Sequence, residues 1–269
     1  MNVPELHPLN DGFTWAPATG PWRRIRAEQA QSYDERGFLV LEDAFDAGTM
    51  ARLIAEIDPH EDRVERMLQA QEGGRFFIAR AGEITFTTHL VTRSPSLRDF
   101  AASQVFQDLA HDLIGDDVRL YWDQAVYKKP ETNADFPWHQ DNGYTFVRPQ
   151  QYLTCWLALT DATEENGCPW VVPGMHRKGT LKHWMTDLGW RCFEDVPGAI
   201  AVPVRAGSIV IFSSLTPHRT GPNLTSTVRK SWILQYAPCG AKMILGENLV
   251  ACEDPGRQFL VLSAGQAPG

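Results

Sequence analysis

Apolar residues in the N-terminal third of the chain recur at helical spacing. Over residues 47–57 they stand three and four positions apart, which predicts a helix with one buried face, and Asp58-Pro59 is expected to end it. The uninterrupted apolar run 37–41 predicts a short buried strand instead. Residues 1–26 show neither period and are expected to be irregular. By the same criteria, further helices are predicted over residues 26–35, 62–71 and 97–114.

The pattern changes after residue 117, where short β-prone runs alternate with Pro, Gly and Asn. These runs follow one another too closely, with no helices between them, for a doubly wound parallel sheet, so they favour a β-sandwich or barrel. The predicted fold class is therefore α+β. We expect one domain over residues 1–269, mainly helical over 1–116, with a jelly-roll core over 117–245 and a C-terminal extension over 246–269. The predicted strands span residues 118–128, 151–160, 170–172, 200–204, 208–212 and 230–237.

Composition narrows the function classes. Of the 269 residues 43% are hydrophobic, enough for one sizeable core, and the net charge of -8 comes with no Lys/Arg run longer than two residues, so no nucleic-acid partner is expected. No apolar stretch approaches the roughly 20 residues that a bilayer requires, so no membrane partner is expected either. The five cysteines are odd in number and lack a Cys-x-x-Cys pair, which favours reduced thiols in the cytoplasm. Composition leaves the oligomeric state open.

A His-x-Asp pair, His139 and Asp141, is the first candidate for chemistry. Residues two apart on an extended segment project to the same side, so the imidazole and the carboxylate can meet one cation. His218, in a loop after the apolar run 209–212, is the candidate third ligand. Two histidines and one carboxylate form a facial triad, the arrangement expected of iron(II) oxygenases that bind a chelating co-substrate and O2. His-x-Asp alone is weak evidence, because so short a pattern often occurs by chance.

Arg229 strengthens this interpretation. It lies eleven residues after His218 and opens a predicted strand in which it shares a face with Ser231, Ile233 and Gln235, so it can point into a barrel. A guanidinium inside a barrel requires a carboxylate partner, and the far carboxylate of a dicarboxylic keto-acid suits it. The alternative is a salt bridge to one of the 33 acidic residues.

Seven short motifs, in order, span most of the chain. They are Tyr33-x-x-x-Gly37-Phe38-Leu39-Val40-Leu41, Tyr127-Lys128-Lys129-Pro130, Pro137-Trp138-His139-Gln140-Asp141, Trp156-Leu157-Ala158-Leu159-Thr160-Asp161, Glu165-Asn166-Gly167, Val172-Pro173-Gly174-Met175-His176 and His218-x10-Arg229. Together they resemble the phytanoyl-CoA dioxygenase family of iron(II)- and 2-oxoglutarate-dependent oxygenases. Met175 departs from the Ser usual in that family, and the resemblance leaves His176 outside the metal site.

The resemblance implies a double-stranded β-helix, that is, a cupin-like jelly roll with the N-terminal helices packed on it. It also implies iron(II) held by His139, Asp141 and His218, with 2-oxoglutarate and O2 as co-substrates. The residues expected to line the 2-oxoglutarate pocket are Lys128, Trp156, Gln124 and Thr220, with Arg229 gripping the far carboxylate.

The implied reaction is oxidation of an unactivated C-H bond in a small molecule, with release of succinate and CO2. Hydroxylation is the default outcome, and cyclisation, epimerisation or desaturation remain open. Acidity and aromatic content favour a small, partly apolar, polycyclic or otherwise uncharged substrate, as in bacterial secondary metabolism, and the absence of a long basic stripe argues against a CoA thioester. Two alternatives stay open: a metal-dependent jelly-roll hydrolase or isomerase without a keto-acid, and a non-catalytic barrel that binds or senses a small molecule.

Other residues near the motifs have weaker claims. The histidines at 89, 111 and 183 are interpreted as core or surface residues. Aromatic residues around the metal motif could wall a substrate pocket or pack in the core, and a second group could form a lid. The first group is Trp138, Tyr144 and Phe146, and the second is Arg80, Phe86 and the segment 176–195 with Trp184, Met185 and Trp190.

Overall fold

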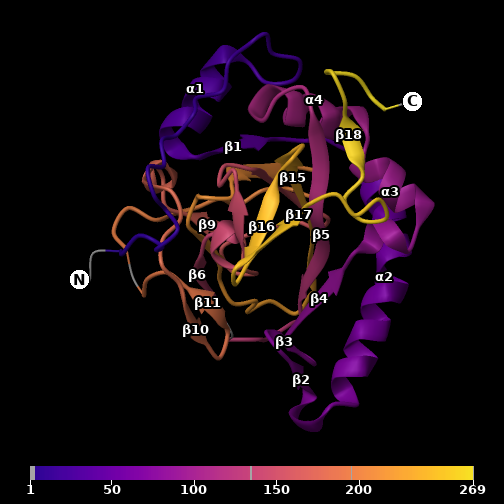
Figure 1. Cartoon of the computed structure of the whole chain (residues 1–269). Coiled ribbons are helices and arrows are strands. Elements are labelled where there is room, and N and C mark those ends of the chain that lie inside the picture. Colours follow the sequence, from indigo (N-terminus) through magenta and orange to yellow (C-terminus); the bar gives the residue numbers. More distant parts are fainter. Residues whose placement is uncertain (1–3, 134, 195, 269) are drawn as a thin grey trace.

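The computed structural model describes residues 4–133, 135–194 and 196–268. Within these ranges, antiparallel strands form the centre of the molecule and the α-helices lie along its outside (Figure 1). This mixture agrees with the predicted α+β class. The helices are α1 (Ala27–Arg36), α2 (Ala47–Gln69), α3 (Pro95–Ala101) and α4 (Gln104–Leu113), with 3-10 helices η1 (Glu72–Gly74), η2 (Leu90–Thr92), η3 (Asp141–Gly143) and η4 (Met175–Lys178).

The largest sheet joins strands from both ends of the chain. Its order is β1-β13-β8-β15-β5-β4-β3-β2, and β18 pairs with β5 beside this path. The N-terminal strand therefore sits next to β13, and the C-terminal strand lies on β5. These strands are β1 (Phe38–Leu41), β2 (Arg75–Phe76), β3 (Ala79–Arg80), β4 (Ile84–Thr88), β5 (Val118–Lys128), β8 (Leu153–Ala158), β13 (Ile209–Ser213), β15 (Arg229–Pro238) and β18 (Leu260–Leu262).

Three smaller sheets complete the body. One has the order β12-β9-β14-β6, one has the order β17-β16-β7, and β10 pairs with β11 alone. That the whole chain forms a single domain stays a prediction. The strands are β6 (Phe136–His139), β7 (Phe146–Arg148), β9 (Pro169–Val171), β10 (Trp184–Thr186), β11 (Gly189–Arg191), β12 (Ile200–Ala201), β14 (His218–Thr220), β16 (Lys242–Leu245) and β17 (Asn248–Ala251).

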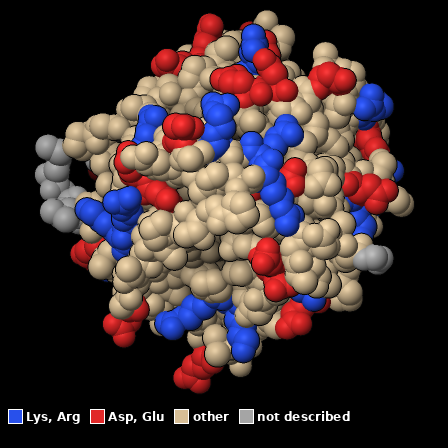
Figure 2. All heavy atoms as spheres, turned by 90° about the horizontal axis from the view of Figure 1, so that it is seen from above, with Lys and Arg blue, Asp and Glu red and all other residues tan. Residues whose placement is uncertain are grey.

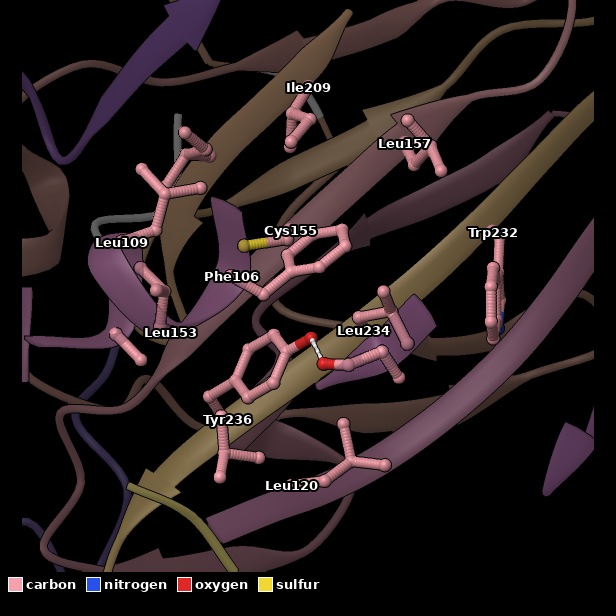
Figure 3. Close-up of a cluster of buried hydrophobic side chains, with 14 of the residues drawn as sticks. Phe106, Leu109, Leu120, Leu153, Cys155, Leu157, Ile209, Trp232, Leu234 and Tyr236 are labelled. Atoms are coloured by element: carbon pink, nitrogen blue, oxygen red, sulfur yellow. Dashed lines mark hydrogen bonds between the residues drawn. The ribbon is translucent and has the colours of Figure 1, made fainter. Parts of the chain in front are cut away.

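The large sheet separates two apolar cores. On β15, Trp232, Leu234 and Tyr236 point to the helices, where they pack with Phe106 of α4 (Figure 3). Ile233 points the other way and packs between the two larger sheets. Successive residues of a strand face opposite sides, so this one strand contributes to a helix-covered core and to the barrel interior. The alternation agrees with the face predicted for this strand.

The predicted end of a helix at Asp58-Pro59 is wrong, because α2 continues through Pro59 to Gln69. A proline inside a helix removes one backbone hydrogen bond and costs about 3 kcal/mol. The residues that follow are held by the sheet: Glu61 accepts a hydrogen bond of 2.7 Å from Lys129 Nζ, and Leu68 is fully buried. These tertiary contacts offset the cost, and the helix predicted over 62–71 is the second half of α2.

The single helix predicted over 97–114 is also wrong, because α3 and α4 are separate helices. Ala102 and Ser103 lie between them, and Ser103 is the N-cap residue of α4 with extended backbone angles. Serine favours such a position over a helix interior. The break lets Phe106 and Leu109 of α4 face the large sheet, where both are fully buried.

The surface carries both signs of charge. Seen from above, basic and acidic side chains are interspersed over the face shown in Figure 2. None of the helices in the described ranges combines the length and the apolar character that crossing a bilayer requires. All five cysteines are free thiols, as their number and spacing predicted.

Candidate metal centre

Three elements bring His139, Asp141 and His218 together. His139 ends β6, Asp141 opens η3 and His218 opens β14. Strands β6 and β14 pair antiparallel with His218 opposite His139, so their ring centroids lie 4.1 Å apart. Asp141 Oδ1 lies 3.9 Å from His139 Nε2 and 3.8 Å from His218 Nε2, and one ligand atom from each residue lies within 4.8 Å of the others. Bonds of about 2.1 Å to one ion span up to about 4.2 Å between ligands, so both carboxylate distances suit a shared metal.

Both imidazoles are held in the tautomer that a metal requires. His139 Nδ1 donates to Pro137 O at 2.8 Å, and His218 Nδ1 donates to Thr216 O at 3.0 Å, which leaves each Nε2 lone pair to the centre of the cluster. Burial lowers the pKa of His139 to about 3 and that of His218 to about 4, so both rings are neutral near pH 7. Burial also raises the pKa of Asp141, as expected of a carboxylate that needs a cation.

Asp141 is oriented from the opposite sheet. Its Oδ2 accepts a hydrogen bond of 2.6 Å from Thr154 Oγ1 on β8, and Gln235 Nε2 on β15 donates to the same hydroxyl at 3.4 Å. Oδ1 is thereby left to face the two imidazoles. The sequence analysis missed Thr154 and Gln235, although a polar residue inside an apolar strand was the available signal.

We expect Thr154→Val to weaken metal binding by about 10- to 100-fold, because the substitution keeps the shape of the side chain and removes the hydrogen bond that orients Asp141. Iron(II) affinity measured by competition with a chelator is the readout. Thr87→Val is the matched control, since Thr87 is a buried threonine whose hydroxyl has no partner among the described residues. Equal affinity in the two variants would show that Thr154 has no such role.

Arg229 is buried with half of its guanidinium unused. Nη1 donates to Ser231 Oγ at 2.6 Å and to Val126 O at 3.4 Å, whereas Nε and Nη2 have no partner among the described residues. These two nitrogens form one edge of the guanidinium, the edge that pairs with both oxygens of a carboxylate. Burial lowers the pKa of Arg229 to about 10, so it remains charged at pH 7. The indole of Trp156 lies 5.3 Å below it. The arrangement fits a buried carboxylate ligand.

Lys128 lies directly opposite Arg229 in the β5–β15 register. Its Nζ donates to the carbonyls of Thr220, at 2.9 Å, and Gly221. Burial lowers the pKa of Lys128, with the Arg229 charge adding to the effect. Lys128 thus links β5 to the end of β14 beside Arg229. Thr220 contributes its backbone carbonyl to this contact.

Trp156 and Gln124 face the barrel from either side of Ile233, the residue that each of them pairs with on β15. Gln124 accepts a hydrogen bond of 3.2 Å from Trp122 Nε1. Four of the five predicted pocket residues therefore lie on the neighbouring strands β5, β8 and β15, and Thr220 lies on β14 of another sheet, where its carbonyl meets Lys128. Their roles toward a co-substrate stay predictions.

The segment 179–183, part of the segment expected to form a lid, holds Gln140 between the two ligands of the His-x-Asp pair, a contact that the sequence analysis missed. Gln140 is fully buried, and its side chain donates to Gly179 O and Leu215 O and accepts from Leu181 N. Its backbone N–H donates to His183 Nε2 at 2.9 Å. His183 Nδ1 donates to Leu181 O at 2.9 Å, so both ring nitrogens have protein partners. His183 is therefore a structural residue outside the metal cluster, as predicted. The signal was a buried polar side chain between two candidate ligands.

The remaining weak candidates lie outside the metal cluster. His176 Nε2 donates to Asp34 O at 3.1 Å, and Trp138 packs in a core cluster with Phe193. Within the described ranges, His139, Asp141 and His218 are the only group of three or more histidine, cysteine or acidic side chains that could hold one metal ion.

Comparison with known proteins agrees with this geometry. The chain is 28% identical to a phytanoyl-CoA dioxygenase of Arabidopsis thaliana over 146 residues, 52% of this chain and 52% of that protein. It is 26% identical to the ectoine dioxygenase of Bordetella bronchiseptica over 234 residues, 79% of this chain and 75% of that protein. The chain thus aligns with about half the length of the first relative and with more of the second.

The fold has solved counterparts. The epimerase SnoN, solved in complex with Fe3+, alpha ketoglutarate and nogalamycin RO, matches with a TM-score of 0.68 at 24% identity, over 87% of this chain and 97% of that chain. This likeness confirms the jelly-roll prediction. The family model for phytanoyl-CoA dioxygenase matches residues 33–231, well over half of the sequence. The chain therefore belongs to the phytanoyl-CoA dioxygenase family.

Proposed function

We propose that the chain is an iron(II)- and 2-oxoglutarate-dependent dioxygenase that oxidises an unactivated C-H bond of a small molecule. The observation that carries this proposal is the facial cluster of His139, Asp141 and His218 in the same barrel as a buried arginine with a free edge, Arg229. A hydrolase or isomerase that uses no keto-acid would leave that arginine edge without a carboxylate partner.

In this proposal His139, Asp141 and His218 hold iron(II). Two neutral imidazoles and one carboxylate suit iron(II), which would supply the oxidation together with 2-oxoglutarate and O2. The Nδ1 hydrogen bonds of both histidines and the Thr154 hydroxyl hold the three ligands in place. The protein's part would therefore be to fix these three ligand atoms beside one ion.

Arg229 takes the far carboxylate of 2-oxoglutarate through Nε and Nη2. Trp156 forms the floor of this pocket, Lys128 holds its wall together through the Thr220 carbonyl, and Gln124 adds a polar contact. With both bound, iron(II) and 2-oxoglutarate supply the oxidation: O2 and the keto-acid convert R–H to R–OH, succinate and CO2. Burial keeps bulk water from the pocket, which favours the carboxylate–guanidinium pair.

Hydroxylation is the default outcome, and cyclisation, epimerisation or desaturation of the same C-H bond require only a different placement of the substrate. The epimerase likeness shows that this fold accommodates such an outcome in another protein. The substrate is a small molecule, and the five free thiols fit work in the cytoplasm.

The test is release of CO2 from 2-oxoglutarate labelled at C1, with purified protein, iron(II), ascorbate and air. We expect labelled CO2 and succinate in equal amounts, slowly without substrate and faster with it. The same assay with a chelator present is the control. A protein that binds iron(II) but leaves the keto-acid intact would be the jelly-roll hydrolase or isomerase, and one that binds neither would be the silent barrel.

A further inference from the structure

Three aromatic side chains, Phe86, Phe136 and Tyr144, border the metal cluster; we name them the aromatic wall. The rings of Phe136 and Tyr144 stand edge-on to His139, with centroids 4.9 and 5.2 Å away and interplanar angles of 88° and 81°. They stack on each other at 6.4 Å, and Phe86 packs on Phe136 at 5.6 Å. All three are only half-buried, although each lies next to the interior. The wall therefore offers ring surface beside the ion that the proposed function requires.

The hydroxyl of Tyr144 lacks an acceptor. Its oxygen is buried, and the backbone N–H of Trp190 is directed at it as a donor, but no acceptor for its own proton lies among the described residues. A phenol is protonated near pH 7 and can donate. A buried donor without an acceptor costs about 1–3 kcal/mol, and native proteins rarely leave one.

The β10–β11 hairpin covers this hydroxyl. Gly189 of β11 lies so close that a Cβ added there would be 2.7 Å from the phenol oxygen and 3.2 Å from Ile78. The hairpin forms a sheet of its own and lies near β2 and β3 (Figure 1), whose Arg75 and Arg80 each donate to Asp187 O at 3.0 Å. These exposed contacts hold the turn of the hairpin, whereas β11 lies against β6, where Cys192 N–H donates to Trp138 O at 2.9 Å.

A hollow leads from the surface toward this point. It has a volume of about 580 Å³ and is lined by both hairpins, with Phe77 and Ile78 on one side and Met185 on the other. Ile78 borders the hollow and also lies against Gly189 above the Tyr144 hydroxyl. Ile78 and Gly189 therefore stand between the hollow and the aromatic wall, and a shift of the β10–β11 hairpin would join the two.

The charged side chain that acts on the Tyr144 hydroxyl is Asp141, a proposed metal ligand. At Gly189, where the hairpin covers the hydroxyl, the neighbouring side chains are Ile78 and the ring of Phe136. The charged groups deeper in the barrel have other partners: Lys128 binds backbone carbonyls, and Asp141 and Arg229 serve the metal and co-substrate in the proposed function. An ionic substrate group beside Tyr144 would be buried without a counter-charge, which is costly.

We propose that Tyr144 recognises the substrate: its hydroxyl donates to a carbonyl, ether or hydroxyl oxygen of an uncharged, ring-bearing molecule whose ring lies on the aromatic wall. The molecule enters from the hollow between the hairpins and is covered by Gly189. This inference rests on the proposed function for the identity of the site, and it names the substrate class that the site accepts.

Three small probes of similar shape test it: acetophenone, which has a ring and an acceptor; ethylbenzene, which lacks the acceptor; and benzoate, which is charged. Dissociation constants are measured by ligand-observed NMR on the full chain loaded with zinc(II) and 2-oxoglutarate, so that no turnover occurs. We expect wild type to bind acetophenone about three- to tenfold more tightly than ethylbenzene, the range for one hydrogen bond of about 0.5–1.5 kcal/mol, and to bind benzoate least.

Tyr144→Phe keeps the ring and is expected to remove the preference for acetophenone while leaving ethylbenzene binding unchanged. Tyr127→Phe is the matched control, because the Tyr127 hydroxyl bonds to Asp58 of α2 on the outer side of the sheet. A preference that survives in Tyr144→Phe, tightest binding of benzoate, or no probe binding to wild type would each overturn the proposal. Release of CO2 from 2-oxoglutarate without substrate reports on the proposed function independently of these probes.

Discussion

Asp141→Ala is expected to lower 2-oxoglutarate-dependent CO2 release by on the order of 10³, with a matching loss of iron(II) affinity. Asp141 supplies the only anionic oxygen of the cluster, lying 3.9 and 3.8 Å from the two imidazole Nε2 atoms. Without it, two neutral rings alone face a doubly charged ion, and the several kcal/mol of electrostatic stabilisation that a fixed metal provides are lost. The rate is measured with labelled 2-oxoglutarate and the affinity with a competing chelator.

Asp62→Ala provides the comparison, since Asp62 is an exposed carboxylate on α2. Its rate and iron(II) affinity should equal those of wild type. If Asp141→Ala kept half of the wild-type rate with iron bound, the assignment of Asp141 as a metal ligand would be wrong, and with it the facial triad.

Arg229→Met should raise the KM for 2-oxoglutarate about a hundredfold or more while leaving iron(II) affinity close to wild type. Truncating one partner of a buried, hydrogen-bonded charge pair costs about 2–5 kcal/mol, much of it because the other charge stays buried and unpaired. Arg229 has the free Nε and Nη2 edge that such a pair requires. Steady-state CO2 release against keto-acid concentration gives the value.

Two comparisons sharpen this result. Lys230→Met changes the next residue of β15, which points outward to Asp58 at 2.8 Å, and it should leave the KM unchanged. The keto-acid 2-oxopentanoate, which lacks the far carboxylate, should be a poor co-substrate for wild type and lose little further in Arg229→Met. An Arg229→Met protein that still prefers 2-oxoglutarate by the wild-type factor would rule out the proposed grip.

The strands were the part of the fold that hydrophobic pattern could predict. The predicted strand 118–128 coincides with β5, because β-branched and aromatic side chains recur along it and Pro130 follows it. Short strands such as β2, β3, β10 and β11 escaped prediction, since two or three residues carry no measurable period. Their pairing depends on neighbours that are distant in sequence.

The helices show where local rules fail. Pro59 is a strong local stop signal, and its effect was overridden by contacts such as Glu61 with Lys129, which lie 68 residues apart. At Ser103 the error was the opposite one: the apolar positions on both sides suggested one continuous helix, although serine favours the N-cap position and does begin α4 there. Local signals therefore predicted a helix end where the helix continues, at Pro59, and a continuous helix where there is a break, at Ser103.

For the site, spacing and residue type were enough to suggest His139, Asp141, His218 and Arg229, because each chemistry limits the side chains that can perform it. The supporting contacts could not be deduced this way. Thr154 and His183 are ordinary residues whose roles arise from the sheet register and from the path of a loop. Only coordinates show which hydroxyl meets which carboxylate.

The position of β18 has a consequence for the order in which the molecule can be assembled on the ribosome. Strand β5 pairs with β15 and with β18, which lie more than a hundred residues downstream, and β1 waits for β13 in the same way. Strand β4 precedes β5 and can pair with it at once, but the edge of β5 that faces β15 stays unpaired until that later strand is synthesised. Such late pairing slows folding and exposes the nascent chain to aggregation.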